Sequence, residues 1–351
     1  MRFSVSTVKD TPENVERFVA GNLAGGIDHL VVFLDDPDDP ATSAVRTLLD
    51  AHDHVTCVVA DDAWWRGKRP EQLNVRQRIN ANLVRSALTL VERAEWVFHI
   101  DGDEMVRLDP AAMAAVPATE HVVQLAPLEA VSRRRWDAPP TWFKRLLAEP
   151  ELTLLQVLGT IDRAHNGAYF HGHVEGKTGV RPAHDVWLAL HRALDESGNE
   201  VAAYRHDDLS VLHFESWSGE DFVRKWTSVL AAGPMAAFRP ARAPTAIALR
   251  ALLDRGLTEE QAAPLLMRIF ERTTQDDFET LRTLNLLEEV DPMRPLAEPE
   301  SLTADEREGI SGLLEALATR PKRPFHPGQP AAGAEKILSE AAGGRRRLFR
   351  R

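Results

Sequence analysis

Short apolar runs and helical patterns alternate along the first sixty residues. Apolar runs at 3–8, 27–34 and 54–60 predict three strands. Between them, apolar side chains recur every three or four positions, which predicts helices over about 12–24 and 42–51. Crossovers this short predict a parallel sheet with right-handed connections.

A long helix and a further strand follow. Residues 61–70 are expected to form a loop with two tryptophans and three cations. From Val75 to Val91 every fourth residue is apolar, which predicts a helix with one apolar face. Residues 96–100, WVFHI, are apolar without alternation, which is typical of a strand buried on both faces.

The second half of the chain carries weaker signals. Residues 153–161 fit either a strand or a helix, and a capping-box-like pattern opens a helix at 218–221. Prolines from Pro234 onward mark a boundary, after which the pattern is helical and alanine-rich. Further strands are predicted at 122–126, 186–190 and 209–214. We therefore predict an α/β domain over 1–233, a helical region over 234–320, and an irregular tail with a basic end over 321–351.

Composition narrows the possible partners and compartment. The 351 residues carry a net charge of −11, which argues against nucleic acid as a specific partner. A single cysteine, Cys57, excludes a disulfide framework or a thiolate zinc site within one chain. There is no signal-peptide pattern and no run of 18 apolar residues. We expect a cytoplasmic protein.

The C-terminal end differs in charge from the rest of the chain. One interpretation is a weak anchor that makes the protein peripheral to the inner membrane face, through anionic lipid or another polyanion. The alternative is a disordered solubilising end. Five of the last seven residues are arginine: Arg345, Arg346, Arg347, Arg350 and Arg351.

Three carboxylates directly follow the apolar run at 96–100: Asp101, Asp103 and Glu104. Side chains two apart in an extended chain point to the same side, so Asp101 and Asp103 can converge. Like charges this close repel unless a cation lies between them. Oxygen ligands favour a hard divalent ion, Mg²⁺ or Mn²⁺.

The alternative interpretation of this segment is a solvated hairpin turn, because Asp-Gly is a strong hairpin signal. Two features weigh against it. The flanking residues do not alternate as hairpin strands do. Downstream, Asp109 and Pro110 look like the N-cap and first residue of a helix. A calcium loop is excluded because Val106 and Ala112 stand where glycine and glutamate are needed.

Over residues 3–226 the order of these features resembles the glycosyltransferase family 2-like enzymes of the GT-A fold. The matching positions are Gln77 in the helix before the metal motif, the motif at 101–104, the Gly-Lys to Arg-Pro segment at 176–182, and His213 at the end of a late strand. The chain departs from the family pattern at Lys9-Asp10 and at the acidic run 35–39. It also has no clear Glu-Asp pair of the kind that supplies the catalytic base in many inverting members of the family.

The resemblance implies an α/β, GT-A-like fold: a mostly parallel sheet flanked by helices, here with a helical C-terminal extension. It implies a metal-dependent transfer of a sugar from a UDP- or GDP-sugar to an acceptor hydroxyl, usually with inversion, using Mn²⁺ or Mg²⁺. The acceptor would be a glycan, a lipid-linked molecule or a small molecule.

Roles follow for individual residues. The acceptor hydroxyl must lose its proton to a base. Asp185 is the first candidate for this base and Glu175 is the second. The resemblance assigns the metal to Asp101, Asp103 and His213. It assigns donor contacts to Thr7, Asp10, Asp35, Gln77, Asp101, Lys177 and Arg181. His171 and His173 lack a third ligand at the usual zinc spacing, and for Trp136, Trp142 and Trp187 packing is favoured over sugar stacking.

Two other classes of function remain open. A metal-dependent nucleotidyltransferase or phosphohydrolase would use the same carboxylates, since it also places a divalent ion on a diphosphate. A non-catalytic nucleotide-sugar-binding module could keep the fold without turnover.

Overall fold

The computed structural model describes residues 1–231 and 243–343, and the chain divides into two compact units. The first unit comprises Met1–Ala126, Glu175–Val211 and Pro292–Arg351. The second comprises Pro127–Val174 and Leu212–Asp291. The chain therefore leaves the first unit twice and returns twice, a division that differs from the three consecutive parts expected from the sequence. The C-terminal arginines lie outside the described residues.

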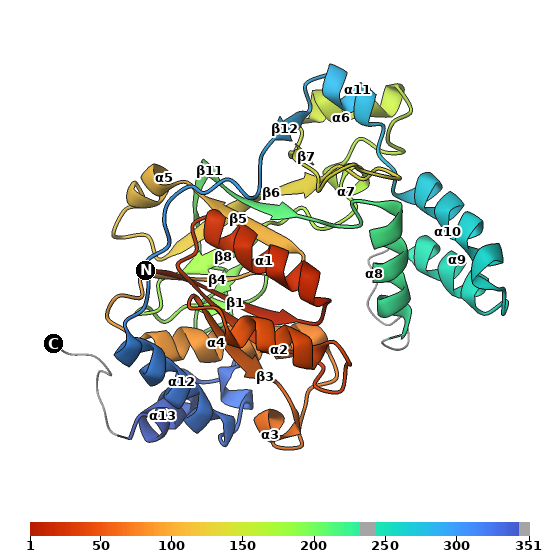
Figure 1. Cartoon of the computed structure of the whole chain (residues 1–351). Coiled ribbons are helices and arrows are strands. Elements are labelled where there is room, and N and C mark those ends of the chain that lie inside the picture. The colour runs from red at the N-terminus through yellow and green to blue at the C-terminus, as the bar shows by residue number, and fades with distance from the viewer. Residues whose placement is uncertain (232–242, 344–351) are drawn as a thin grey trace. The chain divides into compact units, whose positions relative to one another are not determined.

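The first unit is built on a sheet in which four neighbouring strands are parallel (Figure 1). They lie in the order β3-β2-β1-β4, and β8 and β6 continue the sheet in the antiparallel sense. The α/β fold with a mostly parallel sheet is thus confirmed. The bounds are β1 (Arg2–Val8), β2 (His29–Leu34), β3 (Val55–Val59), β4 (Trp96–His99), β6 (Val122–Ala130) and β8 (Lys177–Val180).

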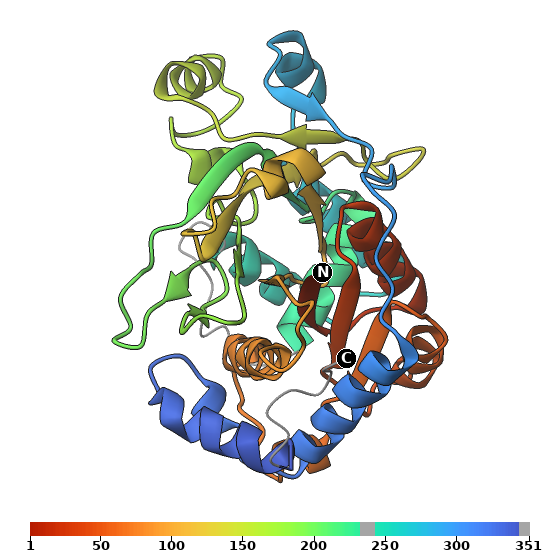
Figure 2. The same ribbon diagram turned by 90° about the vertical axis from the view of Figure 1, so that its left-hand side faces the viewer.

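Helices cover both faces of this sheet. Along β2, Val31 belongs to one hydrophobic core and Val32 to the other, as alternation along a strand requires. The first core is closed by α4 (Leu73–Leu88), α12 (Ala304–Ala318) and α13 (Ala331–Ala341), which lie side by side in Figure 2. The second is closed by α1 (Pro12–Ala24), α2 (Thr42–Asp50) and α5 (Pro110–Ala114). Double coverage explains why the strands are continuous apolar runs.

Smaller elements complete the first unit. Residues 104–108 form an additional strand, β5, which pairs with β11. The Asp109 side chain caps α5 and Pro110 begins it, as predicted. The remaining bounds are α3 (Asp62–Trp65), β5 (Glu104–Leu108), β9 (Trp187–Leu188), β10 (Ala193–Leu194), β11 (Tyr204–His213) and the 3₁₀ helix η1 (Arg323–Phe325). The last residues of β6, from Pro127, and of β11, from Leu212, belong to the second unit.

The second unit has two hydrophobic cores of its own. The first lies around Leu155 and Tyr169, the second around Phe222 and Phe270. Thr258 and Gln261 form a capping box at the start of α10. The bounds are β7 (Trp142–Lys144), α6 (Glu149–Val157), α7 (Asn166–Tyr169), α8 (Gly219–Ala231), α9 (Ala243–Leu253), α10 (Glu259–Thr273), α11 (Phe278–Thr283) and β12 (Leu287–Glu289).

Several segments differ from the sequence-based expectation. The loop expected at 61–70 contains the short helix α3, whose two tryptophans are buried. The ambiguous segment 153–161 lies largely in helix α6. Part of the tail expected to be irregular forms α13, which packs against α4 and α12. In each case contacts with distant residues stabilise a helix that the local pattern did not predict. No described helix combines the length and apolar character that a membrane crossing requires.

His29 makes the stability of the first unit depend on pH. Its side chain is fully buried on β2, with Nε2 2.8 Å from the Thr56 hydroxyl oxygen. Burial lowers the pKa of His29 to about 3, and the charges of His54, Arg307 and His52 add to the effect. In the unfolded chain the His29 imidazole takes up a proton near pH 6.5. The contribution of neutral His29 to the stability of the folded chain is therefore complete above pH 6.5 and is lost as the pH falls toward 3.

We expect the His29→Gln variant to show a weaker pH dependence of its free energy of unfolding. In the unmodified chain, the buried imidazole contributes a loss of up to roughly 5 kcal/mol between pH 6.5 and pH 3. Urea unfolding at a series of pH values measures this difference. Parallel pH profiles for the two proteins would contradict the assignment.

Candidate functional site

The carboxyl ends of β1 and β4 form the topological switch point of the first unit. The chain passes from β1 to β2 and β3 on one side, and then crosses to place β4 on the other side of β1. In open α/β sheets, ligands bind in the crevice at such a point. Asp101 lies two residues after the end of β4, and a Cβ added to Gly102 would lie 3.3 Å from Val8 Cγ1 at the end of β1. The acidic turn therefore packs against the last residue of β1.

Asp101 is held by residues from two other elements. Gln77 Nε2 on α4 donates to Asp101 Oδ1 at 2.7 Å. The Lys177 ammonium on β8 donates to the other carboxylate oxygen and lies 3.2 Å from Glu104 Oε2. The Asp101 main-chain N–H donates to the same Glu104 oxygen at 2.9 Å. The structure thus brings together three of the predicted site residues: Gln77, Asp101 and Lys177.

Lys177 supplies positive charge where the sequence argument placed a metal ion. Its side chain is fully buried. Burial favours a lower pKa of Lys177, but the charges of Asp101 and Glu104 outweigh burial and raise it, so the ammonium keeps its proton at neutral pH. The repulsion between neighbouring carboxylates therefore does not by itself require a divalent ion. A Cβ at Gly179 would overlap the Phe98 ring, so β8 needs glycine to approach β4 this closely.

The acidic segment is not a hairpin. Within the described residues β4 pairs with β1 and β8, whereas β5, which follows the turn, pairs with β11. Asp103 lies in the turn and is partly exposed. The hairpin alternative is therefore wrong, and Asp101 and Asp103 stand at the end of a buried parallel strand.

Helix α4 directs polar side chains from two successive turns at the strand ends. Asn80 Nδ2 donates to Thr7 Oγ1 at 3.1 Å. Arg76 forms a bidentate pair with Asp35, with Nε at 2.7 Å from Oδ1 and Nη2 at 2.5 Å from Oδ2. Arg76, Gln77 and Asn80 are all buried. Sequence reasoning missed Arg76 and Asn80, although the polar side of this otherwise buried helix was the available signal.

Two other predicted donor residues have local partners. Asp10 Oδ1 accepts a hydrogen bond from Asn14 Nδ2 at 2.7 Å at the start of α1. Arg181 Nε donates to the Glu120 carbonyl at 3.0 Å, and its guanidinium lies 4.3 Å from the centre of the Trp96 ring. These contacts fix both side chains in the first unit, and their donor-binding roles stay predictions.

The two candidate bases are exposed. Asp185 lies in the segment before β9, and Glu175 lies before β8 with one carboxylate oxygen 3.7 Å from Arg192 Nη2. Neither bonds to Asp101 in the part of the chain that the structure describes. Their catalytic assignment stays a prediction.

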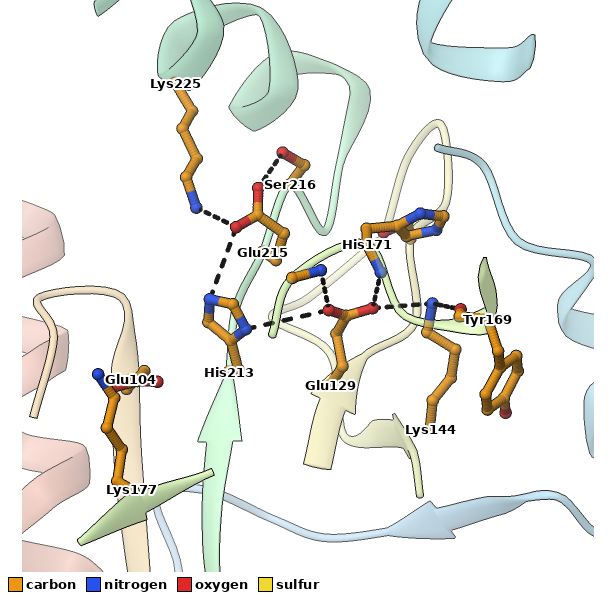
Figure 3. Close-up of polar contacts among 12 residues, drawn as sticks. Glu104, Glu129, Lys144, Tyr169, His171, Lys177, His213, Glu215, Ser216 and Lys225 are labelled. Carbon is orange, nitrogen blue, oxygen red and sulfur yellow. Dashed lines mark hydrogen bonds and ion pairs between the residues drawn. The ribbon is translucent and has the colours of Figure 1, made fainter. Parts of the chain in front are cut away.

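A buried ionic network occupies the second unit (Figure 3). Glu129 and Lys144 are both fully buried, with Lys144 Nζ 2.9 Å from Glu129 Oε1 and 3.0 Å from Asp276 Oδ1. The main-chain N–H groups of His171 and Gly172 donate to Glu129 at 2.8 and 2.5 Å. Burial would raise the pKa of Glu129, but the charges of Lys144, His171 and His213 and the hydrogen bond from the His171 N–H together outweigh burial and lower it. The two carboxylates in turn raise the pKa of Lys144. The charged forms of Lys144 and of the two carboxylates, Glu129 and Asp276, therefore stabilise one another.

His213 lies at one end of this network. Its Nδ1 is 3.9 Å from Glu129 Oε2, and its Nε2 is 3.6 Å from Glu215 Oε2. Lys225 Nζ donates to Glu215 at 2.6 Å, and the His173 ring stacks on His213 with centroids 4.8 Å apart. Carboxylate and imidazole groups of this kind can ligate a divalent ion. Because His213 belongs to the second unit and Asp101 to the first, their joint metal site stays a prediction.

The three tryptophans considered for sugar stacking have packing roles. Trp187 is buried in the first unit with the Arg85 guanidinium 5.3 Å from its ring centre. In the second unit, Trp136 and Trp142 both contact the Phe278 ring edge to face. These contacts agree with the preference for packing.

No family model and no curated protein matches this chain. Among solved structures it is similar to HddC from Yersinia pseudotuberculosis, with 10% identity, a TM-score of 0.32, and coverage of 64% of this chain and 97% of that one. It is also similar to a mannose-1-phosphate geranyltransferase from Thermus thermophilus, with 13% identity, a TM-score of 0.27, and coverage of 52% of this chain and 58% of that one. Similarities at this level assign no activity, and the α/β architecture rests on the strand pairing described above.

Proposed function

We propose that this chain is a metal-dependent glycosyltransferase that moves a sugar from a nucleoside diphosphate to an acceptor hydroxyl. The observation that supports it most is the position of Asp101 at the switch point. Gln77 and Lys177 hold its two oxygens, and Asp103 follows two residues later. A fixed carboxylate beside a second one is what a metal–diphosphate site needs.

The donor atoms fit a hard divalent ion such as Mn²⁺ or Mg²⁺. Each oxygen of Asp101 accepts one hydrogen bond from a neighbouring side chain, and a carboxylate oxygen has two lone pairs, so capacity for a metal bond remains. Asp101 and Asp103 are the proposed ligands from the first unit, and His213 is the proposed ligand from the second. When bound, the ion would stabilise the charge that develops on the leaving diphosphate.

The other residues would bind and orient the donor. The nucleobase and ribose of the donor would bind near the strand ends, where Thr7, Asp10 and Asp35 lie. The two hydrogen bonds from Arg76 hold the Asp35 carboxylate in one orientation. Lys177 and Arg181 are the proposed donor contacts from β8 and the segment after it.

The acceptor hydroxyl needs a base beside it. Asp185 is the first candidate for the base that takes the proton from the acceptor hydroxyl, and Glu175 is the second candidate. The acceptor would be a glycan, a lipid-linked molecule or a small molecule, and the donor a UDP- or GDP-sugar.

Replacing Asp103 by asparagine should weaken nucleotide binding only when the metal is present. We expect the affinity for UDP or GDP in Mn²⁺ to fall by about tenfold or more, because one anionic ligand is lost, while the affinity in EDTA is unchanged. Isothermal titration calorimetry measures both. Asp50→Asn, an exposed carboxylate on α2, is the matched control. Equal Mn²⁺-dependent affinity in the Asp103 variant and the control would count against the metal site.

The products distinguish this proposal from its alternatives. The chain is incubated with a panel of UDP-, GDP- and dTDP-sugars and Mn²⁺. Slow release of free sugar and nucleoside diphosphate supports sugar transfer. Pyrophosphate or nucleoside monophosphate would instead indicate a nucleotidyltransferase or phosphohydrolase, and binding without any product would indicate a non-catalytic module.

A further inference from the structure

A pocket of 670 Å³ lies in the first unit, lined by α3, the first turns of α4 and the segment 321–329. Its volume falls in the range of pockets that hold small organic molecules. The residues that line it include none of those assigned to the nucleotide-sugar site. The pocket therefore needs an explanation of its own.

The charge of this pocket opposes that of the whole chain. Arg66, Lys68, Lys322 and Arg323 line it, and among the residues that the structure describes no aspartate or glutamate does. None of the four forms an ion pair within residues 1–231 and 243–343. In a chain with 53 acidic and 42 basic residues, four cations around one pocket without a carboxylate form a concentrated positive site.

An apolar wall completes the pocket. Trp65, Val75 and Ile79 supply it from α3 and α4. Trp65 is 3% exposed, and its indole N–H has no hydrogen-bond partner in the described part of the chain. A buried donor left unsatisfied is destabilising, and a ligand with an acceptor oxygen would satisfy it.

Lys322 contributes charge rather than hydrogen bonds. Burial lowers the pKa of Lys322 to about 8, and the nearby Arg66 charge acts in the same direction. Its ammonium lies 4.2 Å from the centre of the Trp64 ring. All three of its donors are used by main-chain carbonyls at the end of α12, those of Leu317, Ala318 and Arg320. An anion in the pocket would offset the repulsion among these cations.

We propose that this pocket binds an organic phosphate, with its apolar body against Trp65 and Val75 and its phosphate among Arg66, Lys68 and Arg323. An arginine guanidinium can donate two parallel hydrogen bonds to two phosphate oxygens. Several cations around one pocket also suit a doubly charged phosphate better than a singly charged carboxylate. The same chemistry is offered by a soluble phosphorylated molecule and by a phospholipid headgroup. The site requires no metal and is independent of the proposed sugar transfer.

The test compares the Arg66→Ala/Arg323→Ala variant with Arg46→Ala, which removes an exposed arginine on α2. Both substitutions are made in the full-length Asp103→Asn chain in EDTA, so that metal-dependent nucleotide binding does not contribute. Adenosine monophosphate and pyrophosphate are titrated by calorimetry, and vesicles of phosphatidylglycerol and phosphatidylcholine are used in flotation.

We expect the unmodified pocket and the Arg46 control to bind at least one of these probes. The double variant should lose about tenfold or more in affinity, and binding should weaken above pH 8 as Lys322 loses its proton. Binding to adenosine monophosphate identifies a soluble ligand, and binding to vesicles alone identifies a lipid headgroup. Equal binding by the double variant and the control, or no binding of any probe, overturns the proposal.

Discussion

The Lys177→Met variant should lose about 3–5 kcal/mol of stability, because it leaves a buried carboxylate without its cation. Glu104 is fully buried, and Lys177 Nζ lies 3.2 Å from its Oε2. Methionine has nearly the length of lysine, so the change removes charge with little change in packing. Because the pKa of Lys177 is raised above 10.5, its contribution to stability is fully present below that pH.

Urea unfolding at neutral pH measures this loss. Lys9→Met is the matched control: Lys9 pairs with Asp36 at 2.8 Å but is 47% exposed, so its loss should cost less than about 1 kcal/mol. The double variant Lys177→Met/Glu104→Gln should recover part of the stability, because the uncompensated charge is removed with the lysine. If the single and double variants are equally unstable, charge compensation is not what Lys177 provides.

In the second unit, Lys144→Met should cost at least about 4 kcal/mol, because two carboxylates depend on this one ammonium. Glu129 and Asp276 lie 2.9 and 3.0 Å from Lys144 Nζ, and neither Glu129 nor Lys144 is exposed at all. Asp276 also accepts a hydrogen bond from the Ser132 main-chain N–H at 2.8 Å. If the Asp276 carboxylate turned away after the loss of Lys144, this main-chain hydrogen bond would be lost too.

Hydrogen exchange locates the effect. Protection should fall in β7 and α7, whose residues bond directly to the network, before it falls in β1 or β2 of the first unit. Lys144→Met/Asp276→Asn should be more stable than Lys144→Met alone, and Arg282→Met, which breaks an exposed pair with Glu279, should have little effect. Uniform loss of protection along the whole chain would contradict the assignment of the network to the second unit.

The parallel sheet was accessible from the sequence because its signals are local. Apolar runs of the right length mark β1, β2 and β3, and Thr11 with Pro12 marks the start of α1. Helices α3 and α13 were missed because distant contacts stabilise them. The short helix α3 buries two tryptophans against the core, and α13 packs on α4.

The site was only partly accessible. Asp101 was singled out by the cluster of carboxylates after β4, and Gln77 and Lys177 by the family resemblance, and the structure joins all three. The role of Lys177 differs from the expectation, because a pattern of carboxylates cannot show that a lysine 76 positions away already compensates them. The Lys144–Asp276 pair spans 132 positions and left no signal in the sequence at all.

The late return of the chain to the first unit has a consequence for synthesis on the ribosome. One face of the parallel sheet is covered in part by α12 and α13, whose residues come after the entire second unit. The apolar surface beside α4 therefore stays open while about two hundred further residues are made, an interval in which a chaperone would be needed to prevent association of nascent chains.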